Sequence, residues 1–183
     1  MTGYQQGILY LNGSLQRSTY TRFAVRSIDR HYVDAVSEIF LPSRPYFQCH
    51  NDPRKRDYWC IKSVHVSMPS LDDVSDWRGF CRAFVELQGS LDLWRRKNRK
   101  GEYIFTPRLR IYGSESDLSA VSLALPAGSK KMQYISTGTG KTCMLAYQSP
   151  AEVRDILDYI DGTPRNDALW LRWSAILSGR HPQ

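Results

Sequence analysis

The stretches Gly7-Ile8-Leu9-Tyr10-Leu11-Asn12-Gly13-Ser14-Leu15 and Ala83-Phe84-Val85-Glu86-Leu87-Gln88-Gly89-Ser90-Leu91 read as two copies of one pattern, 76 positions apart. Each copy has a small residue, three large residues, a Leu, a side-chain amide and then Gly-Ser-Leu. A repeat of this period predicts a tandem pair of similar halves related by a pseudo-two-fold axis. Two-fold symmetry is suited to duplex DNA, which has the same symmetry.

The elements expected around each copy recur in the same order. The copies themselves are predicted as helices over residues 3–13 and 74–89, the first ending at Gly13 as a helix C-cap. The first is followed by a strand at 22–27, a helix at 29–40 and a hairpin of 46–50 and 58–67. The second is followed by a loop at 94–101, a strand at 105–112, a helix at 114–125, a hairpin of 131–136 and 142–148, and helices at 150–160 and 168–177. We therefore expect an α+β fold with a first repeat at 1–69 and a second at 70–183, fused into one compact unit.

Composition narrows the class of protein. The chain has 183 residues, 42% of them hydrophobic, a formal net charge of +7 and a pI near 9.3. A basic balance favours nucleic acid as a partner, because phosphates carry the opposite charge. No apolar run of about 18 residues is present, and the start lacks signal-peptide features, so we expect a cytoplasmic protein with no membrane partner. Four cysteines without C-x-x-C spacing are expected to be reduced thiols, with no metal site.

The cations cluster at comparable places in the two halves. Arg54, Lys55 and Arg56 occupy the expected hairpin tip of the first half, and the predicted loop of the second half holds Arg95, Arg96, Lys97, Arg99 and Lys100. Arg22 and Arg26, and Arg108 and Arg110, alternate along the corresponding strands, so each pair should share one face. Antiparallel strands can present such side chains to phosphates and base edges in a major groove. All twelve residues are candidates for nucleic-acid binding.

The two motif copies and the similar order of elements after each of them resemble the LAGLIDADG homing endonucleases. The resemblance covers about residues 3–178. The resemblance implies two antiparallel sheets that form a DNA-binding saddle with helices behind them. It also implies that the two motif helices pack side by side through small residues, here Gly7 and Ala83, and that the protein is a monomer. The eighth position of the family motif is a catalytic acid that helps hold a divalent cation.

Amides stand at both of those positions here, as Asn12 and Gln88. An amide oxygen is a neutral and weaker ligand for Mg²⁺ than a carboxylate, and it is a poor base for water. Glu86 precedes Gln88 by two residues, about 200° around the helix, and cannot easily replace an acid at that position. The sequence therefore leans against enzymatic activity and predicts no cofactor, with Mg²⁺ required only if the protein is a working nuclease.

A nucleotide site is not expected. Gly140-Lys141-Thr142 ends like a P-loop, but Ile135 stands where the pattern requires Gly, and the following residues read as a strand instead of a helix. We expect sequence-selective binding of double-stranded DNA by a catalytically degenerate LAGLIDADG-type protein, such as a transcriptional regulator. Two alternatives stay open at this point: an active metal-dependent homing endonuclease, and a protein–protein interaction module on the same fold.

Overall fold

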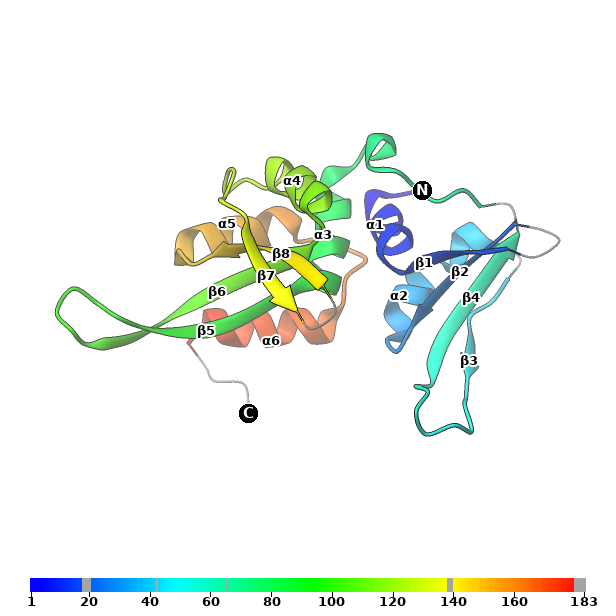
Figure 1. The fold of residues 1–183 in the computed structure, drawn as a ribbon, viewed down its shortest axis with the longest axis horizontal. Coiled ribbons are helices and arrows are strands. Elements are labelled where there is room, and N and C mark those ends of the chain that lie inside the picture. The colour runs from blue at the N-terminus through cyan, green and yellow to red at the C-terminus, as the bar shows by residue number, and fades with distance from the viewer. Residues whose placement is uncertain (18–20, 42, 65, 138–139, 180–183) are drawn as a thin grey trace. The chain divides into compact units, whose positions relative to one another are not determined.

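The computed structural model describes residues 1–17, 21–41, 43–64, 66–137 and 140–179. The chain divides into two compact units, Met1–Ala83 and Phe84–Gln183, and each unit holds one four-stranded antiparallel sheet (Figure 1). The strand order is β1-β2-β4-β3 in the first sheet and β5-β6-β8-β7 in the second. The order is thus the same in both sheets, and the predicted α+β fold with two similar antiparallel repeats is confirmed.

The predicted helices, strands and hairpins occur in the predicted order, but each motif helix is followed directly by a strand that the sequence did not predict. The elements of the first unit are α1 (Gly3–Asn12), β1 (Gly13–Arg17), β2 (Thr21–Ser27), α2 (Arg30–Ala35), the 3-10 helix η1 (Ser37–Phe40), β3 (Tyr46–Gln48), β4 (Tyr58–Val64) and the 3-10 helix η2 (Leu71–Asp73). Helix α3 (Trp77–Gln88) spans the division between the units. The second unit continues with β5 (Gly89–Lys97), β6 (Tyr103–Gly113), α4 (Glu115–Ala124), β7 (Gln133–Thr137), β8 (Gly140–Tyr147), α5 (Pro150–Ile160) and α6 (Asp167–Leu177).

The repeated Gly-Ser-Leu endings mark a direct junction between helix and strand. Helix α1 ends at Gly13 as predicted, but this glycine has an extended backbone (φ −70°, ψ 149°) and is the first residue of β1. A Cβ on Gly13 would lie 2.1 Å from Cζ of Phe23, and one on Gly89 would lie 2.2 Å from the carbonyl oxygen of Val85. Both repeats therefore need glycine here because the chain turns from helix to strand without room for a side chain.

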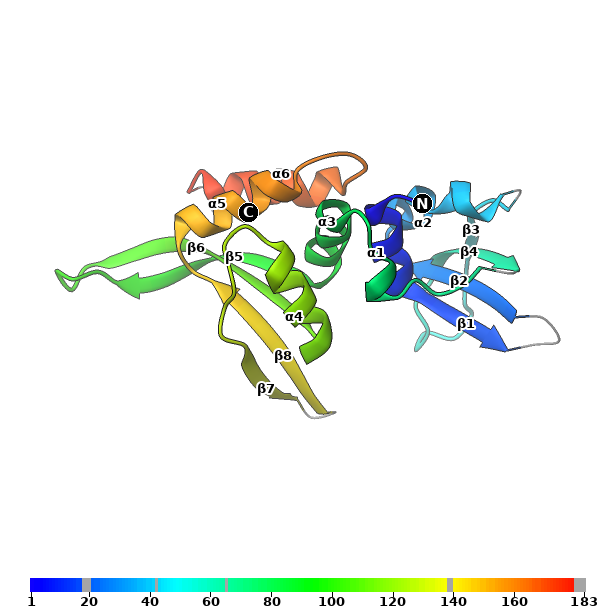
Figure 2. The ribbon, with the colours of Figure 1, turned by 90° about the horizontal axis from the view of Figure 1, so that it is seen from above.

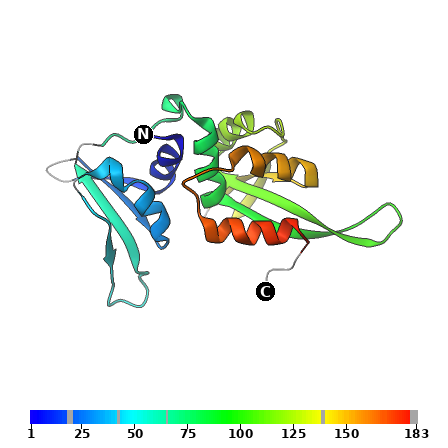
Figure 3. The ribbon, with the colours of Figure 1, turned by 180° about the vertical axis from the view of Figure 1, so that it is seen from behind.

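Helix α1 lies against the first half of α3 (Figure 3). A Cβ added at Gly7 would stand 2.6 Å from Cβ of Ala83 and 3.0 Å from the carbonyl oxygen of Phe80. The ring of Tyr10 meets that of Phe80 edge-on at 5.7 Å. The small residues Gly7 and Ala83 thus allow the close helix approach that the family resemblance implied, and this packing brings the start of α3 into the first compact unit.

The core of the first unit lies on one face of its sheet. Phe23, Val25 and Ile61 share that face and are fully buried against α1, α2 and η1. The ring of Phe23 stacks on Phe40 at 5.7 Å. The predicted helix at 29–40 is two elements, because Val36 caps α2 and the chain continues as the tighter η1.

The second unit is built in the same way, with more helices. Leu91, Leu109 and Ile111 are buried on the face of the sheet that α4, α5 and α6 cover (Figure 2). The opposite face carries the other alternate residues of β5 and β6. Each sheet therefore has one helix-covered face and one open face, which is the arrangement that exposes polar side chains for binding. None of the helices in the described part of the chain is long and apolar enough to cross a membrane.

The largest error of the sequence prediction concerns β5. Residues 94–101 were expected to form a loop, but Trp94–Lys97 belong to β5 and pair in register with Tyr103–Thr106 of β6. Arg95, Arg96 and Lys97 are therefore strand residues, and only Arg99 and Lys100 lie in the turn. The alternation of β5 is hidden in the sequence because Arg95, Arg96 and Lys97 are consecutive charged residues and so place cations on both faces of the strand.

Candidate nucleic-acid interface

The open face of the first sheet gathers three cations. Arg22 and Arg26 share this face as predicted, and Lys62 of β4 lies beside them because it pairs with Ala24 between the two. All three residues are exposed. The guanidinium of Arg26 lies 5.8 Å from the ring centre of Tyr58, and Nζ of Lys62 lies 5.7 Å from that of Tyr46. A hydrogen bond between Lys62 and Tyr46 raises the pKa of the lysine above its ordinary value.

The basic triplet of the first half lies where it was predicted, in the connection between β3 and β4. Arg54, Lys55 and Arg56 are exposed there. Arg54 forms an ion pair with Asp52, with Nε 3.1 Å from Oδ1, and this arginine lowers the pKa of the Asp52 carboxyl. The pair is highly solvated, so it adds little stability and does not fix the arginine.

The open face of the second sheet has a different organisation. Arg108 and Arg110 share it as predicted, and both bind the carboxylate of Asp92 on the neighbouring strand. Nε of Arg108 lies 3.0 Å from Oδ1 of Asp92 and its Nη2 lies 2.9 Å from Oδ2. Nη2 of Arg110 lies 2.6 Å from the same Oδ2. The two guanidinium groups, first Arg108, lower the pKa of the Asp92 carboxyl, so the three charges form one ionised cluster.

Strands β5 and β6 continue beyond the rest of their sheet as a two-stranded ribbon (Figure 1). Pairing of β6 with β8 runs from Leu109 to Gly113, whereas pairing with β5 continues out to Tyr103. Pro107, which has no N–H to donate, lies beyond the last residue paired with β8. The ribbon carries the densest positive charge of the chain.

Cations lie on both faces of the ribbon. The guanidinium of Arg95 stacks 3.7 Å from the ring centre of Tyr103, and Nζ of Lys97 lies 5.3 Å from the same ring. Arg96 points to the opposite, open face by strand alternation. Arg99 and Lys100 are exposed in the turn, which Asn98 closes through hydrogen bonds with Glu102. All five predicted binding residues of this segment are accessible.

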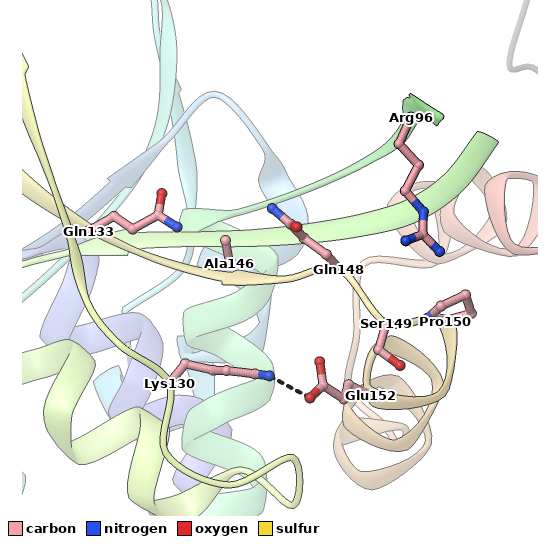
Figure 4. A pocket seen from close by; sticks show the side chains of 8 residues that line it. All are labelled: Arg96, Lys130, Gln133, Ala146, Gln148, Ser149, Pro150 and Glu152. Atoms are coloured by element: carbon pink, nitrogen blue, oxygen red, sulfur yellow. Dashed lines mark hydrogen bonds and ion pairs between the residues drawn. The ribbon is translucent and has the colours of Figure 1, made fainter. Parts of the chain in front are cut away.

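A polar hollow of about 480 Å³ lies beside the end of β8 in the second unit (Figure 4). Arg96, Gln133 and Gln148 line it, together with the ion pair between Nζ of Lys130 and Oε1 of Glu152 at 2.5 Å. Because Glu152 neutralises Lys130, the unpaired positive charge in the described lining is that of Arg96. Its lining thus joins polar residues of the open face to the ion pair beside the start of α5.

Both motif amides lie at the ends of their helices. Asn12 is the last residue of α1 and Gln88 the last of α3, and each is half-buried. The buried Nδ2 of Asn12 has no hydrogen-bond partner among the described residues. The described residues also contain no group of three or more His, Cys, Asp or Glu side chains that could hold a metal ion.

The acids nearest to Gln88 in sequence are engaged elsewhere. Asp92 binds the two arginines, and Glu86 is buried beside the start of α6, where it accepts hydrogen bonds from Nε1 of Trp170 at 2.6 Å and from the backbone N–H of Asn166 at 3.2 Å. Glu86 thus holds α6 in place. The amide oxygens at the motif positions do not fit the charged-oxygen coordination that Mg²⁺ requires.

The comparisons with known proteins place this fold among the LAGLIDADG endonucleases. The LAGLIDADG meganuclease I-AabMI, in a structure bound to uncleaved DNA, matches with a TM-score of 0.68 at 7% identity, over 97% of this chain and 91% of that chain. The LAGLIDADG homing endonuclease I-LtrWI bound to target DNA matches with a TM-score of 0.64 at 10% identity, over 96% and 89%. Full-length DUF199/WhiA from Thermatoga maritima matches with a TM-score of 0.56 at 14% identity, over 99% of this chain and 61% of that chain.

No protein-family model matches this sequence, and neither does any curated protein sequence. The chain therefore has a LAGLIDADG-like fold, as the two motifs indicated. At 7–14% identity these likenesses show the fold alone.

Sequence reasoning missed two residues of the open faces, Asp92 and Lys62. Alternation places Lys62 on the same strand face as Tyr58 and Cys60, but only the register of β2 with β4 places that face with Arg26. Asp92 could not be placed in the same way, because its strand was not predicted. Its partner Arg108 lies 16 positions away, and only the register of β5 with β6 brings them together.

Proposed function

We propose that this chain binds double-stranded DNA sequence-selectively and does not cut it, as a transcriptional regulator would. The observation that carries the proposal is the pair of open sheet faces, each of which presents arginines at alternate positions of antiparallel strands. Two-stranded ribbons and sheets of this kind enter the major groove, where arginine side chains meet phosphates and base edges. The solved structures with this fold include LAGLIDADG proteins bound to DNA.

The amides at Asn12 and Gln88 argue against cleavage. In-line hydrolysis of a phosphodiester by this class of site uses carboxylates to hold divalent cations at the scissile phosphate. Neither motif position carries a carboxylate, and the nearby Glu86 and Asp92 already bind protein groups. We therefore propose that the chain keeps a DNA-binding surface and lacks the metal-dependent cleavage of DNA.

Binding to a randomised duplex library tests the proposal. The full chain is incubated with the library at near-physiological salt with Mg²⁺, the bound DNA is sequenced, and its strands are examined for breaks. We expect enrichment of a defined site with both strands intact. Arg154→Ala, on the exposed side of α5, serves as a charge-matched control for arginine variants of the open faces.

Two outcomes would contradict the proposal in different ways. Staggered breaks at an enriched site, abolished by Asn12→Ala and Gln88→Ala, would show that the protein is an active metal-dependent endonuclease. Absence of any enriched sequence, with weak binding and a shallow salt dependence, would favour a protein–protein interaction module on this fold.

A further inference from the structure

The carboxylate of Asp92 occupies an unexpected place on a basic surface. It is the only acidic residue in the sequences of the four strands of the second sheet, and the strands of the first sheet contain none. It lies on the open face directly across from Arg108 in the register of β5 with β6. An acid on a surface that meets phosphates weakens general affinity for DNA, so its position calls for a specific role.

The contacts of Asp92 fix Arg108 on two sides. Nε and Nη2 of Arg108 bind the two carboxylate oxygens as a fork, and its guanidinium lies 5.6 Å from the ring centre of Trp94. A bidentate pair restricts rotation about the side chain, and the ring restricts it further. Arg108 is left with an outer edge formed by Nη1 and the remaining N–H of Nη2.

Arg110 is held by the same carboxylate through a single atom, Nη2. Its Nε is buried and has no hydrogen-bond partner among the described residues. A purely stabilising ion pair would use this donor, because an unsatisfied buried donor has a free-energy cost. Nη1 of Arg110 takes no part in the ion pair with Asp92, which is formed by Nη2.

The charge of the cluster also distinguishes between two kinds of ligand. Asp92 compensates part of the positive charge of the two arginines, which weakens their attraction to a phosphate. Guanine presents two neutral acceptors, O6 and N7, in the major groove, and a planar arginine edge binds both at once. The loss of net charge therefore affects phosphate binding more than guanine binding, while a fixed orientation favours the guanine contact.

We propose that Asp92 is a positioning residue that orients Arg108 and Arg110 so that their outer N–H groups read guanine in the major groove. This inference rests on the proposed DNA binding and adds a base preference to it. The ligand is a guanine-containing duplex, and the second sheet is the part of the chain that selects it.

The test compares Asp92→Asn with a matched control. Asp92→Asn keeps the size of the side chain and removes its charge, and Asp155→Asn makes the same change at an exposed position of α5. Each variant is taken through selection from the randomised library, and its affinity for a non-selected duplex is measured across a salt series. Thermal unfolding monitored by circular dichroism checks that each variant is folded.

For Asp92→Asn we expect the preference for guanine at one or two positions to fall by about 10-fold. Affinity for the non-selected duplex should stay equal or rise, because a negative charge has been removed from the surface. Asp155→Asn should leave the base preference unchanged. Arg108→Lys gives a second, independent readout: it keeps the charge but removes the planar fork, so the guanine preference should fall in the same way.

Three results would overturn the inference. An unchanged guanine preference in Asp92→Asn or in Arg108→Lys would show that the cluster does not read bases. An equal loss of affinity for all sequences would give Asp92 a structural role only. A wild-type chain that enriches no sequence would remove the proposed function itself, which separates that failure from the first two.

Discussion

The two open sheet faces hold their cations by different means. On the first sheet, Arg26 and Lys62 lie beside the rings of Tyr58 and Tyr46, and none of the strands of that sheet contains an acid. On the second sheet, Arg108 and Arg110 bind the carboxylate of Asp92. A ring orients a cation without cancelling its charge, whereas a carboxylate fixes it more firmly and cancels part of the charge.

The difference suggests a division of labour between similar halves. The first face keeps its full positive charge and is suited to phosphates, which dominate affinity and its dependence on salt. On the second face, Asp92 cancels part of the positive charge but fixes the orientation of the arginines. This face is therefore suited to base edges, which provide selectivity. The following experiments separate these two contributions.

The largest effect is expected from the tip of the β5–β6 ribbon. Replacement of Arg95, Arg96, Lys97, Arg99 and Lys100 by Glu should lower affinity for every duplex by more than about 10³-fold at 150 mM salt. Fluorescence anisotropy with labelled duplexes measures the change. Reversal of Arg154 and Arg172, which are exposed on α5 and α6, is the control. Affinity that survives the ribbon reversal would remove this segment from the interface.

Removal of the cations from the first face should have the next largest effect. The triple variant Arg22→Ala, Arg26→Ala and Lys62→Ala should bind all sequences about 10²-fold more weakly and lower the slope of log affinity against log salt by about three. Its selected sequence should be that of the wild type. A changed base preference in this variant would contradict the division between the two faces.

A smaller effect is expected where the two motif copies differ in their packing. Glu86 occupies the position that Tyr10 holds in the first copy, and it accepts hydrogen bonds at the start of α6. Glu86→Gln keeps one acceptor but loses the charge, and should lower the free energy of unfolding by about 1.5 kcal/mol. Denaturant unfolding measures this, with Tyr10→Phe as the control in the other copy. An unchanged midpoint would show that α6 is held by its apolar contacts alone.

The smallest effect is expected from pH. The arginines lower the pKa of Asp92. The stability that ionised Asp92 contributes to the fold is therefore fully present above the ordinary aspartate pKa of about 3.9 and is lost only as pH falls through the lower pKa of the folded state. The pKa of Lys62 is raised, so its positive charge and the stability that this charge contributes are lost only as pH rises through a value above about 10.4. Affinity and base preference should therefore stay within about twofold between pH 6 and pH 9. A steeper dependence would indicate that neither face dominates binding.

The sequence predicted the fold well because its strongest signals are local. The two motif helices and the strand, helix and hairpin expected after each could be recognised from the sequence pattern, and the family resemblance added the close packing through Gly7 and Ala83. The strand β5 was missed because Arg95, Arg96 and Lys97 conceal its alternation. The Asp92 cluster depends on that strand, since a one-residue change of register would move Asp92 to the other face of the sheet. A site formed by pairing across strands is therefore visible only when the register is known.

The unsupported part of the β5–β6 ribbon has a geometric consequence. Beyond the last pairing with β8, the ribbon continues for roughly 20 Å as two strands alone. Two-stranded ribbons have a stronger right-handed twist than wider sheets, because no third strand restrains them. Side chains near the tip, such as Arg96, are consequently rotated relative to Arg108 at the base, although both lie on one strand face. A straight duplex bound along the ribbon would therefore be contacted at successive angles around the DNA axis. The twist of the ribbon would let its side chains follow the helical path of one groove.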